Sequence, residues 1–82
     1  MTLVRYFAAA KAAAGVPEEA VEAVTLADVL VVVRARHAPR LAEVLAVCSF
    51  VVDGHPVGSR AHEQVTVGPE SLVDCLPPFA GG

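Results

Sequence analysis

Residues 25–37, TLADVLVVVRARH, form the stretch that decides the fold. Thr25 can cap a helix with its hydroxyl, and Asp28 follows three residues later, as at many helix N-termini. The apolar residues then fall at positions i, i+3, i+4 and i+7, which places them on one helical face: Leu26, Val29, Leu30 and Val33. The stretch predicts an amphipathic helix that must pack against an apolar surface.

Strand patterns on both sides of this helix can supply that surface. Residues 2–7 (TLVRYF) are rich in β-branched and aromatic side chains, and residues 18–24 alternate like an edge strand with one wet face. Downstream, residues 49–52 (SFVV) run into an Asp53-Gly54 turn signal. Residues 72–76 (LVDCL) form the last expected strand, before two prolines end the ladder.

Two shorter helices are also expected. The run 8–14 (AAAKAAA) has very high helix propensity and stops at Gly15. A second turn or two begins at Pro39. Strands around one principal helix predict an α+β domain with a mixed sheet packed on one main helix.

The composition argues against several classes of partner. The 82 residues allow one domain. The net charge is −3 with six scattered Lys and Arg, so we expect no nucleic-acid partner. The longest uncharged apolar run, residues 29–33, is too short to cross a bilayer, and charged residues break up the first twenty positions. We therefore expect a cytoplasmic protein without a membrane partner.

The cysteines and histidines form no metal-binding motif. Cys48 and Cys75 are too far apart for a CxxC motif, and the histidines do not complete a zinc-like spacing, so we expect no metal and two buried, reduced thiols. His37 closes the main helix together with Arg34 and Arg36, where cations suit the helix dipole. Two further histidines, His55 and His62, are expected in loops.

The feature that can carry chemistry is the stretch 76–82, LPPFAGG. Seven extended residues reach roughly 20 Å, and the two prolines stiffen the start of this path. Phe79 can anchor in a partner groove, while Gly81 and Gly82 can thread a narrow channel. We expect a domain over residues 1–76 and a flexible diglycine tail over residues 77–82.

The carboxylate of a terminal glycine is a poor electrophile. Its ordinary pKa is about 3.5, so it is an anion at neutral pH. It must be activated, typically by adenylation, before a sulfur nucleophile can displace AMP and leave a thiocarboxylate.

The ending LPPFAGG and the opening VRYFAAAKAAAG together resemble the small subunits of molybdopterin synthase, the MoaD-type sulfur carriers. The resemblance spans the chain and includes Tyr6-Phe7-Ala8, Lys11 and Gly15. It implies a ubiquitin-like β-grasp fold. The residues 69–71 (PES), Asp53 and Asp74-Cys75 depart from the usual family pattern and put the partner's identity in question.

The resemblance also implies a pathway. An E1-like enzyme of the MoeB type would adenylate Gly82 with ATP, and a sulfur donor would convert it to a thiocarboxylate. The tail would then insert into a MoaE-type large subunit and give its sulfur to cyclic pyranopterin monophosphate. The chain would bind no cofactor and would not be an enzyme on its own. Its partner-binding residues would be Leu76, Pro77, Pro78, Phe79, Ala80 and Gly81.

Several alternatives remain open. A carrier for thiamine thiazole or cysteine synthesis also ends in diglycine, and a ubiquitin-like modifier would join Gly82 to lysines of target proteins. The chain could also be a plain binding module with an idle tail. An enzyme that uses Cys48 or Cys75 with His37, His55 or His62 is the weakest alternative, because no recognisable nucleophile arrangement exists.

Overall fold

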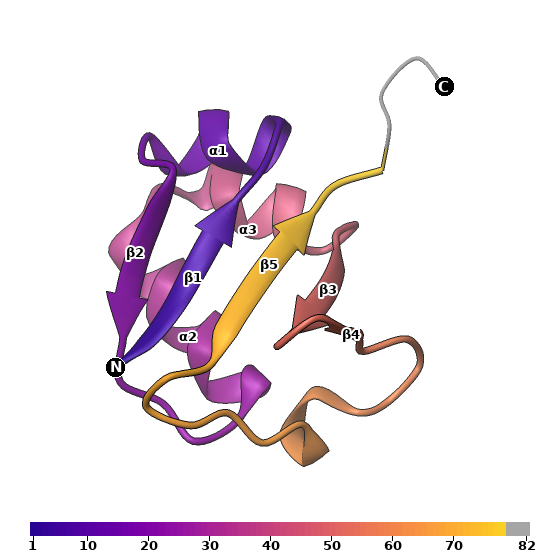
Figure 1. Ribbon diagram of the computed structural model, residues 1–82. Coiled ribbons are helices and arrows are strands. Elements are labelled where there is room, and N and C mark those ends of the chain that lie inside the picture. Colours follow the sequence, from indigo (N-terminus) through magenta and orange to yellow (C-terminus); the bar gives the residue numbers. More distant parts are fainter. Residues whose placement is uncertain (79–82) are drawn as a thin grey trace.

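The computed structural model, which describes residues 1–78, contains one five-stranded mixed sheet (Figure 1). The strand order is β2-β1-β5-β3-β4. The strands are β1 (Thr2–Tyr6), β2 (Glu18–Val21), β3 (Ser49–Val52), β4 (His55–Pro56) and β5 (Leu72–Leu76).

The first and last strands are neighbours in the interior of this sheet. They run parallel, with Leu3 opposite Leu72 and Tyr6 opposite Cys75. The other pairings, β1 with β2, β5 with β3, and β3 with β4, are antiparallel. Alternate residues of β1 are buried, so this strand has one covered face, which bears Val4 and Tyr6.

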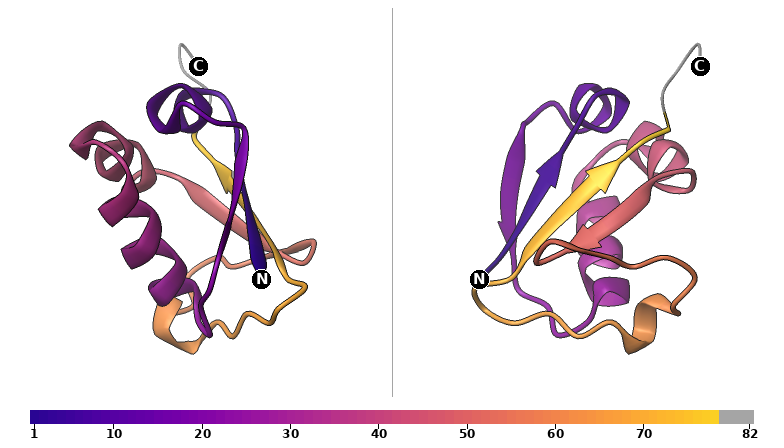
Figure 2. Two further views of the ribbon diagram at one scale, coloured as in Figure 1. Left: turned by 90° about the vertical axis from the view of Figure 1, so that its left-hand side faces the viewer. Right: turned by 45° about the vertical axis from the view of Figure 1, so that its right-hand side comes forward.

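Helices α2 (Leu26–Arg36) and α3 (Pro39–Leu45) cover one face of the sheet (Figure 2, left). Thr25 caps α2, since its Oγ1 accepts a hydrogen bond of 3.2 Å from the backbone N–H of Asp28. Pro39 lies at the start of α3, as expected. The buried residues of α2 are the four that the periodicity predicts: Leu26, Val29, Leu30 and Val33.

The third helix, α1 (Ala9–Ala14), joins β1 to β2 at one end of the sheet (Figure 1). Gly15 ends it in the left-handed region at φ 78°, which glycine adopts without steric cost. Ala8, the residue before the helix, also has a positive φ of 49°. The β3–β4 turn has Asp53 and Gly54 at φ 51° and 81°, as the Asp-Gly signal predicts.

The expected second strand is shorter than its sequence pattern. It ends at Val21, not Val24, because the carbonyl of Val24 accepts a hydrogen bond from Val67 and not from β1. The segment 65–67 contributes a single bridge, between Thr25 and Thr66. A short 3-10 helix, η1 (His62–Gln64), precedes it.

The core lies between α2, α3 and the covered face of the sheet. Its fully buried members come from both ends of the chain and from the main helix, including Val4, Val33 and Val73. The opposite face, which we call the open face, has half-buried residues such as Arg5 and Asp74, and within residues 1–78 no helix covers it (Figure 2). This topology is the expected β-grasp fold, a mixed sheet packed on one main helix.

Candidate functional site

The candidate site is the base of the tail, where β5 reaches the edge of the sheet beside α1 (Figure 1). Because β5 is hydrogen-bonded to β1 on one side and β3 on the other, its end has a fixed position. Leu76 lies opposite Ser49 and is 36% exposed. Pro77 is half-buried and Pro78 is exposed. The chain therefore leaves a rigid strand directly through two prolines.

An apolar patch borders this exit. Parallel pairing of β1 with β5 brings the C-terminal ends of both strands to the same edge of the sheet. Phe7 directly follows β1 and Leu76 is the last residue of β5, and both are exposed. Phe7 is 38% exposed, and the guanidinium of Arg5 lies 5.6 Å from its ring centroid. We call Phe7 and Leu76 the exit patch. It offers a partner apolar area next to the start of the tail.

A bidentate ion pair stands beside the exit patch on the open face. Arg5 Nε donates to Asp74 Oδ1 at 2.7 Å, and Arg5 Nη2 donates to Oδ2 at 3.0 Å. These residues are direct partners in the β1–β5 register. Asp74, which interrupts an otherwise apolar strand, thus lies on the open face and is held by a cation from the neighbouring strand.

Of the predicted site residues, the structure describes three. Leu76, Pro77 and Pro78 lie together at the base of the tail, with Leu76 and Pro78 accessible to a partner. The other four, Phe79, Ala80, Gly81 and Gly82, lie outside the described residues.

The carboxylate of Glu19, on β2, contacts side chains from β1 and from the C-terminal end of α2. Glu19 accepts hydrogen bonds from the Tyr6 hydroxyl at 2.6 Å and from Arg36 Nη1 at 2.9 Å. His37 Nε2 lies within hydrogen-bonding distance of the same carboxylate, and Arg36 also donates to the Ala20 carbonyl at 2.8 Å. We call Tyr6, Glu19, Arg36 and His37 the Glu19 cluster.

The cluster shifts the pKa values of Glu19 and Tyr6. Burial by itself raises the pKa of Glu19, but hydrogen bonds from Tyr6, His37 and Arg36 outweigh it, so this pKa lies below its usual value. Burial and the bond to Glu19 raise the pKa of the Tyr6 hydroxyl far above its usual range. The helix-dipole interpretation of Arg36 and His37 missed these partners. A signal was present, because the alternation of the second strand puts Glu19 on the same side as Val21, where a carboxylate needs a partner.

The cysteines do not form a nucleophilic site with the described histidines. Cys75 is fully buried, and burial raises the pKa of its thiol to about 12. Cys48 is only half-buried, unlike the expectation, and burial also raises its pKa. Within residues 1–78 the histidines have other neighbours or are exposed: His37 meets Glu19, His62 packs edge-on against Phe50, and His55 is exposed. A thiol with a raised pKa is a poor nucleophile at neutral pH.

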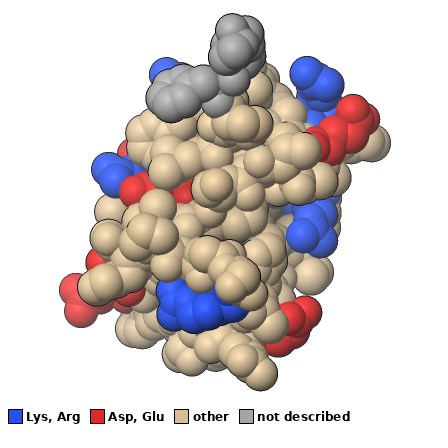
Figure 3. All heavy atoms as spheres, turned by 90° about the vertical axis from the view of Figure 1, so that its right-hand side faces the viewer, with Lys and Arg blue, Asp and Glu red and all other residues tan. Residues whose placement is uncertain are grey.

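On the face drawn in Figure 3, the charged groups do not gather into one patch. Figure 3 shows basic and acidic side chains scattered around a broad uncharged surface. Among residues 1–78, no group of three or more His, Cys, Asp and Glu is arranged to hold a metal ion. In the same part of the chain, no helix is long and apolar enough to cross a membrane.

Comparisons with known proteins give likenesses of fold. No family model and no curated protein matches the sequence. The solution structure of small archaeal modifier protein 1 from Methanosarcina acetivorans has a TM-score of 0.85 at 21% identity, over 99% of this chain and 95% of that one.

Two further solved structures are complexes. A chain of the complex of subunits 1 and 2 of molybdopterin-converting factor from Helicobacter pylori has a TM-score of 0.73 at 21% identity, over 99% of this chain and 97% of that one. A chain of the BexX/CysO complex from Amycolatopsis orientalis has a TM-score of 0.79 at 18% identity, with both chains fully covered. These likenesses confirm the β-grasp fold.

Proposed function

We propose that this protein is a small sulfur carrier that works through the carboxylate of Gly82. The observation that carries the proposal is the junction of β5 with the tail. A strand fixed on both sides runs into Pro77 and Pro78, with the exit patch beside it and the diglycine a few residues beyond. This arrangement suits presentation of an acyl group to the active site of another protein.

The proposed chemistry has two steps. An E1-like enzyme joins the Gly82 carboxylate to the α-phosphate of ATP, which gives an acyl adenylate and releases pyrophosphate. Hydrosulfide then attacks the carbonyl carbon, the bond to the AMP oxygen breaks, AMP and a proton leave, and a thiocarboxylate remains. Gly81 and Gly82 leave that carbonyl open on both sides because neither has a side chain.

The pathway that we favour is molybdopterin synthesis, with this chain as the small, non-catalytic subunit of the synthase. Support comes from the LPPFAGG ending and the YFA opening, and from the fold likeness to the molybdopterin-converting factor of Helicobacter pylori, which is a complex of two subunits. In this proposal the exit patch docks on a MoaE-type large subunit. The tail inserts into the channel of that large subunit, where it contacts the walls through Pro77, Pro78, Phe79, Ala80 and Gly81. Sulfur then passes to cyclic pyranopterin monophosphate.

The first test is activation of Gly82. The purified chain is incubated with an E1-like enzyme from the same organism, ATP and a sulfur source, beside a variant that lacks Gly82. We expect AMP release and the mass gain of one oxygen replaced by sulfur, both absent from the truncated variant. If AMP does not form with any of the E1-like enzymes, the carrier proposal fails.

The second test concerns the pathway and the exit patch. The thiocarboxylate form is added to the large subunit and cyclic pyranopterin monophosphate, and dithiolene formation is followed. We expect Leu76→Glu to weaken binding to the large subunit about tenfold or more, because it puts a charge into an apolar contact. Val31→Glu is the matched control, since Val31 is 62% exposed on α2, away from the exit. Equal binding by the two variants would exclude docking through the exit patch.

A second candidate is a ubiquitin-like modifier that is activated in the same way. The fold likeness to small archaeal modifier protein 1, with a TM-score of 0.85, favours it. Likeness to a chain of the BexX/CysO complex keeps another sulfur pathway open. The acceptor separates the candidates: a carrier gives its acyl group to sulfide, and a modifier gives it to an amine.

A further inference from the structure

The sheet has two edges, formed by β2 and β4, beside which no further strand lies within residues 1–78 (Figure 1). An edge strand presents backbone N–H and C=O groups that another chain can pair with. In an antiparallel strand, successive residues point these groups alternately toward and away from the neighbouring strand. The residues of β2 that face away from β1 therefore decide whether a further strand can be added there.

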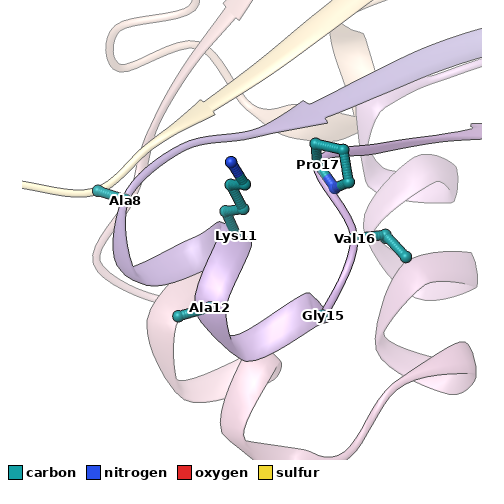
Figure 4. Close-up of a pocket in the computed structure, with 6 residues that line it drawn as sticks. All are labelled: Ala8, Lys11, Ala12, Gly15, Val16 and Pro17. Atoms are coloured by element: carbon teal, nitrogen blue, oxygen red, sulfur yellow. The ribbon is translucent and has the colours of Figure 1, made fainter.

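The backbone of Ala20 faces away from β1. The N–H of Tyr6 donates a 2.8 Å hydrogen bond to the carbonyl of Pro17, so Pro17 faces β1. Pro17 lies directly before β2, at the rim of a hollow beside α1 (Figure 4). The alternation then turns Glu19 toward β1, and it turns Glu18 and Ala20 toward the edge.

The side chain of Arg36 occupies this outward carbonyl. Arg36 Nη1 donates to the Ala20 carbonyl at 2.8 Å and to Glu19 Oε1 at 2.9 Å. The contact with Glu19 anchors the guanidinium to the same strand, and the two bonds use both hydrogens of Nη1. The guanidinium thus lies where the N–H donor of an added strand would have to lie.

The opposite edge of the sheet has the same arrangement. The N–H of Val57 donates to the carbonyl of Phe50 on β3 at 2.9 Å, so Pro56 faces away from β3. Arg60 Nη2 donates to the Pro56 carbonyl at 3.1 Å. Proline has no N–H to offer to a further strand. At both edges, therefore, an arginine binds a carbonyl that points away from the sheet.

We propose that Arg36 is an edge-blocking residue, which prevents a second copy of this chain from adding its own β2 to the sheet. An antiparallel pairing of two β2 strands around Glu19 would place Glu18 of each copy opposite Ala20 of the other. Half of the ladder hydrogen bonds in that pairing would end on an Ala20 carbonyl, which Arg36 already holds. The proposal is independent of the chemistry of Gly82.

The β2 edge needs this protection more than the β4 edge. It is the longer of the two, over Glu18–Val21 against His55–Pro56, and it has no proline inside the strand. Its glutamates repel a second copy, but salt screens repulsion between exposed charges. A guanidinium bound to the carbonyl removes the acceptor itself, so its effect persists when charge repulsion is screened.

The test measures the self-association of the full chain by analytical ultracentrifugation, in about 0.5 M NaCl to screen the glutamates. We expect Arg36→Met to form a dimer with a dissociation constant about tenfold or more below that of the native chain, because each copy regains a ladder acceptor. Arg34→Met is the matched control. Arg34 is exposed on the same helix, so this variant has the same loss of charge and the same added methionine, with the Ala20 contact intact.

Two further variants make the test specific. Arg36→Gln, whose side chain is too short to reach both acceptors, should dimerise as Arg36→Met does. Ala20→Pro in the Arg36→Met background should restore the monomer, because it removes an outward N–H without a loss to the pairing with β1. Circular dichroism checks that each variant is folded.

Two results would overturn the inference. One is that Arg36→Met and Arg36→Gln associate no more strongly than Arg34→Met, since the contact of Arg36 with Ala20 then blocks nothing. The other is a dimer that survives Ala20→Pro, since that dimer forms through another surface.

Discussion

Ala8 has a backbone conformation that a side chain disfavours, with φ 49° and ψ −124°. It occupies the junction where β1 ends and α1 begins, so the chain must reverse there within one residue. A non-glycine residue in such a region stores about 1–3 kcal/mol of strain. The pairing of β1 and the packing of Ala10 in the core maintain this conformation.

Replacement of Ala8 by glycine should therefore stabilise the protein. The strain is relieved, and the greater freedom of glycine in the unfolded chain offsets part of the gain, which leaves a net increase of ~1 kcal/mol in the free energy of unfolding. Urea denaturation measures it. Ala12→Gly is the contrasting control: Ala12 is helical and exposed, so glycine there should cost about 1 kcal/mol. A loss of stability in both variants would contradict the strain argument.

Individual residues were predictable from sequence where a local rule applies. The Asp53-Gly54 turn and the Thr25 cap follow from such rules and are confirmed. The strain at Ala8 could not be foreseen, because it arises from where β1 and α1 are anchored and not from the local sequence AAAKAAA, which favours a helix throughout.

At the scale of elements, the Glu19 cluster joins β2 to the C-terminal end of α2. It also reaches β1 through Tyr6, whose backbone partner in the parallel register is Cys75. The cluster thus links the edge strand and the main helix to the residue that directly precedes Leu76. A carboxylate with three hydrogen-bond partners is a strong local constraint.

Because folding shifts the pKa of Glu19, the free energy of unfolding depends on pH in a defined direction. The pKa of Glu19 is lowered from 4.5 in the folded protein, so its contribution is fully present above the unfolded value and is lost as the pH falls through the folded value. Glu19→Gln should lower the unfolding free energy near pH 7 by roughly 1–3 kcal/mol. It should also flatten the decline of stability below pH 5.

Chemical denaturation at a series of pH values tests this prediction. Glu43→Gln serves as the control, because Glu43 is exposed on α3 and has a weaker 3.6 Å contact with Arg40. It should leave the pH profile almost unchanged. If Glu19→Gln has the same acid profile as the native protein, Glu19 does not carry the linkage.

The helices and strands were largely predictable, because the apolar residues on the buried face of each recur with the period of a helix or of a strand. The buried face of α2 matches the expected apolar positions, and α3 begins at Pro39 as expected. The end of β2 was wrong by three residues, since the hydrogen bond from Val67 to the Val24 carbonyl is a long-range contact that alternation does not reveal. The partners of Arg36 and His37 are hidden for the same reason.

For the whole molecule, the core and the tail are separate parts of the sequence. Within residues 1–78, every buried residue of the hydrophobic core lies in the range from Val4 to Cys75. Removal of residues 77–82 should therefore leave the midpoint of thermal unfolding within about 2 °C of the full chain, since terminal segments outside a core contribute little. The same truncation should abolish AMP formation with the E1-like enzyme.

Circular dichroism and the AMP assay together test this division of the chain. A marked fall in the unfolding midpoint would show that the prolines or the residues beyond them support the domain. The division is a sequence-based prediction, drawn from the Pro-Pro break after the last apolar strand. The β-grasp fold, in contrast, was expected from resemblance to a family, because five short strands permit many pairings that residue patterns alone do not distinguish.

The parallel pairing of β1 with β5 also determines how the molecule responds to force. The chain enters β1 at one end of the sheet and leaves β5 at the opposite end, so traction on the two ends loads the hydrogen bonds between these strands in shear. All of those bonds must break together, whereas a hairpin pulled from its open end unzips one bond at a time. A partner or an unfolding machine that pulls on the C-terminal end therefore loads these bonds in shear, and the domain can be pulled out of a tight channel without being unravelled.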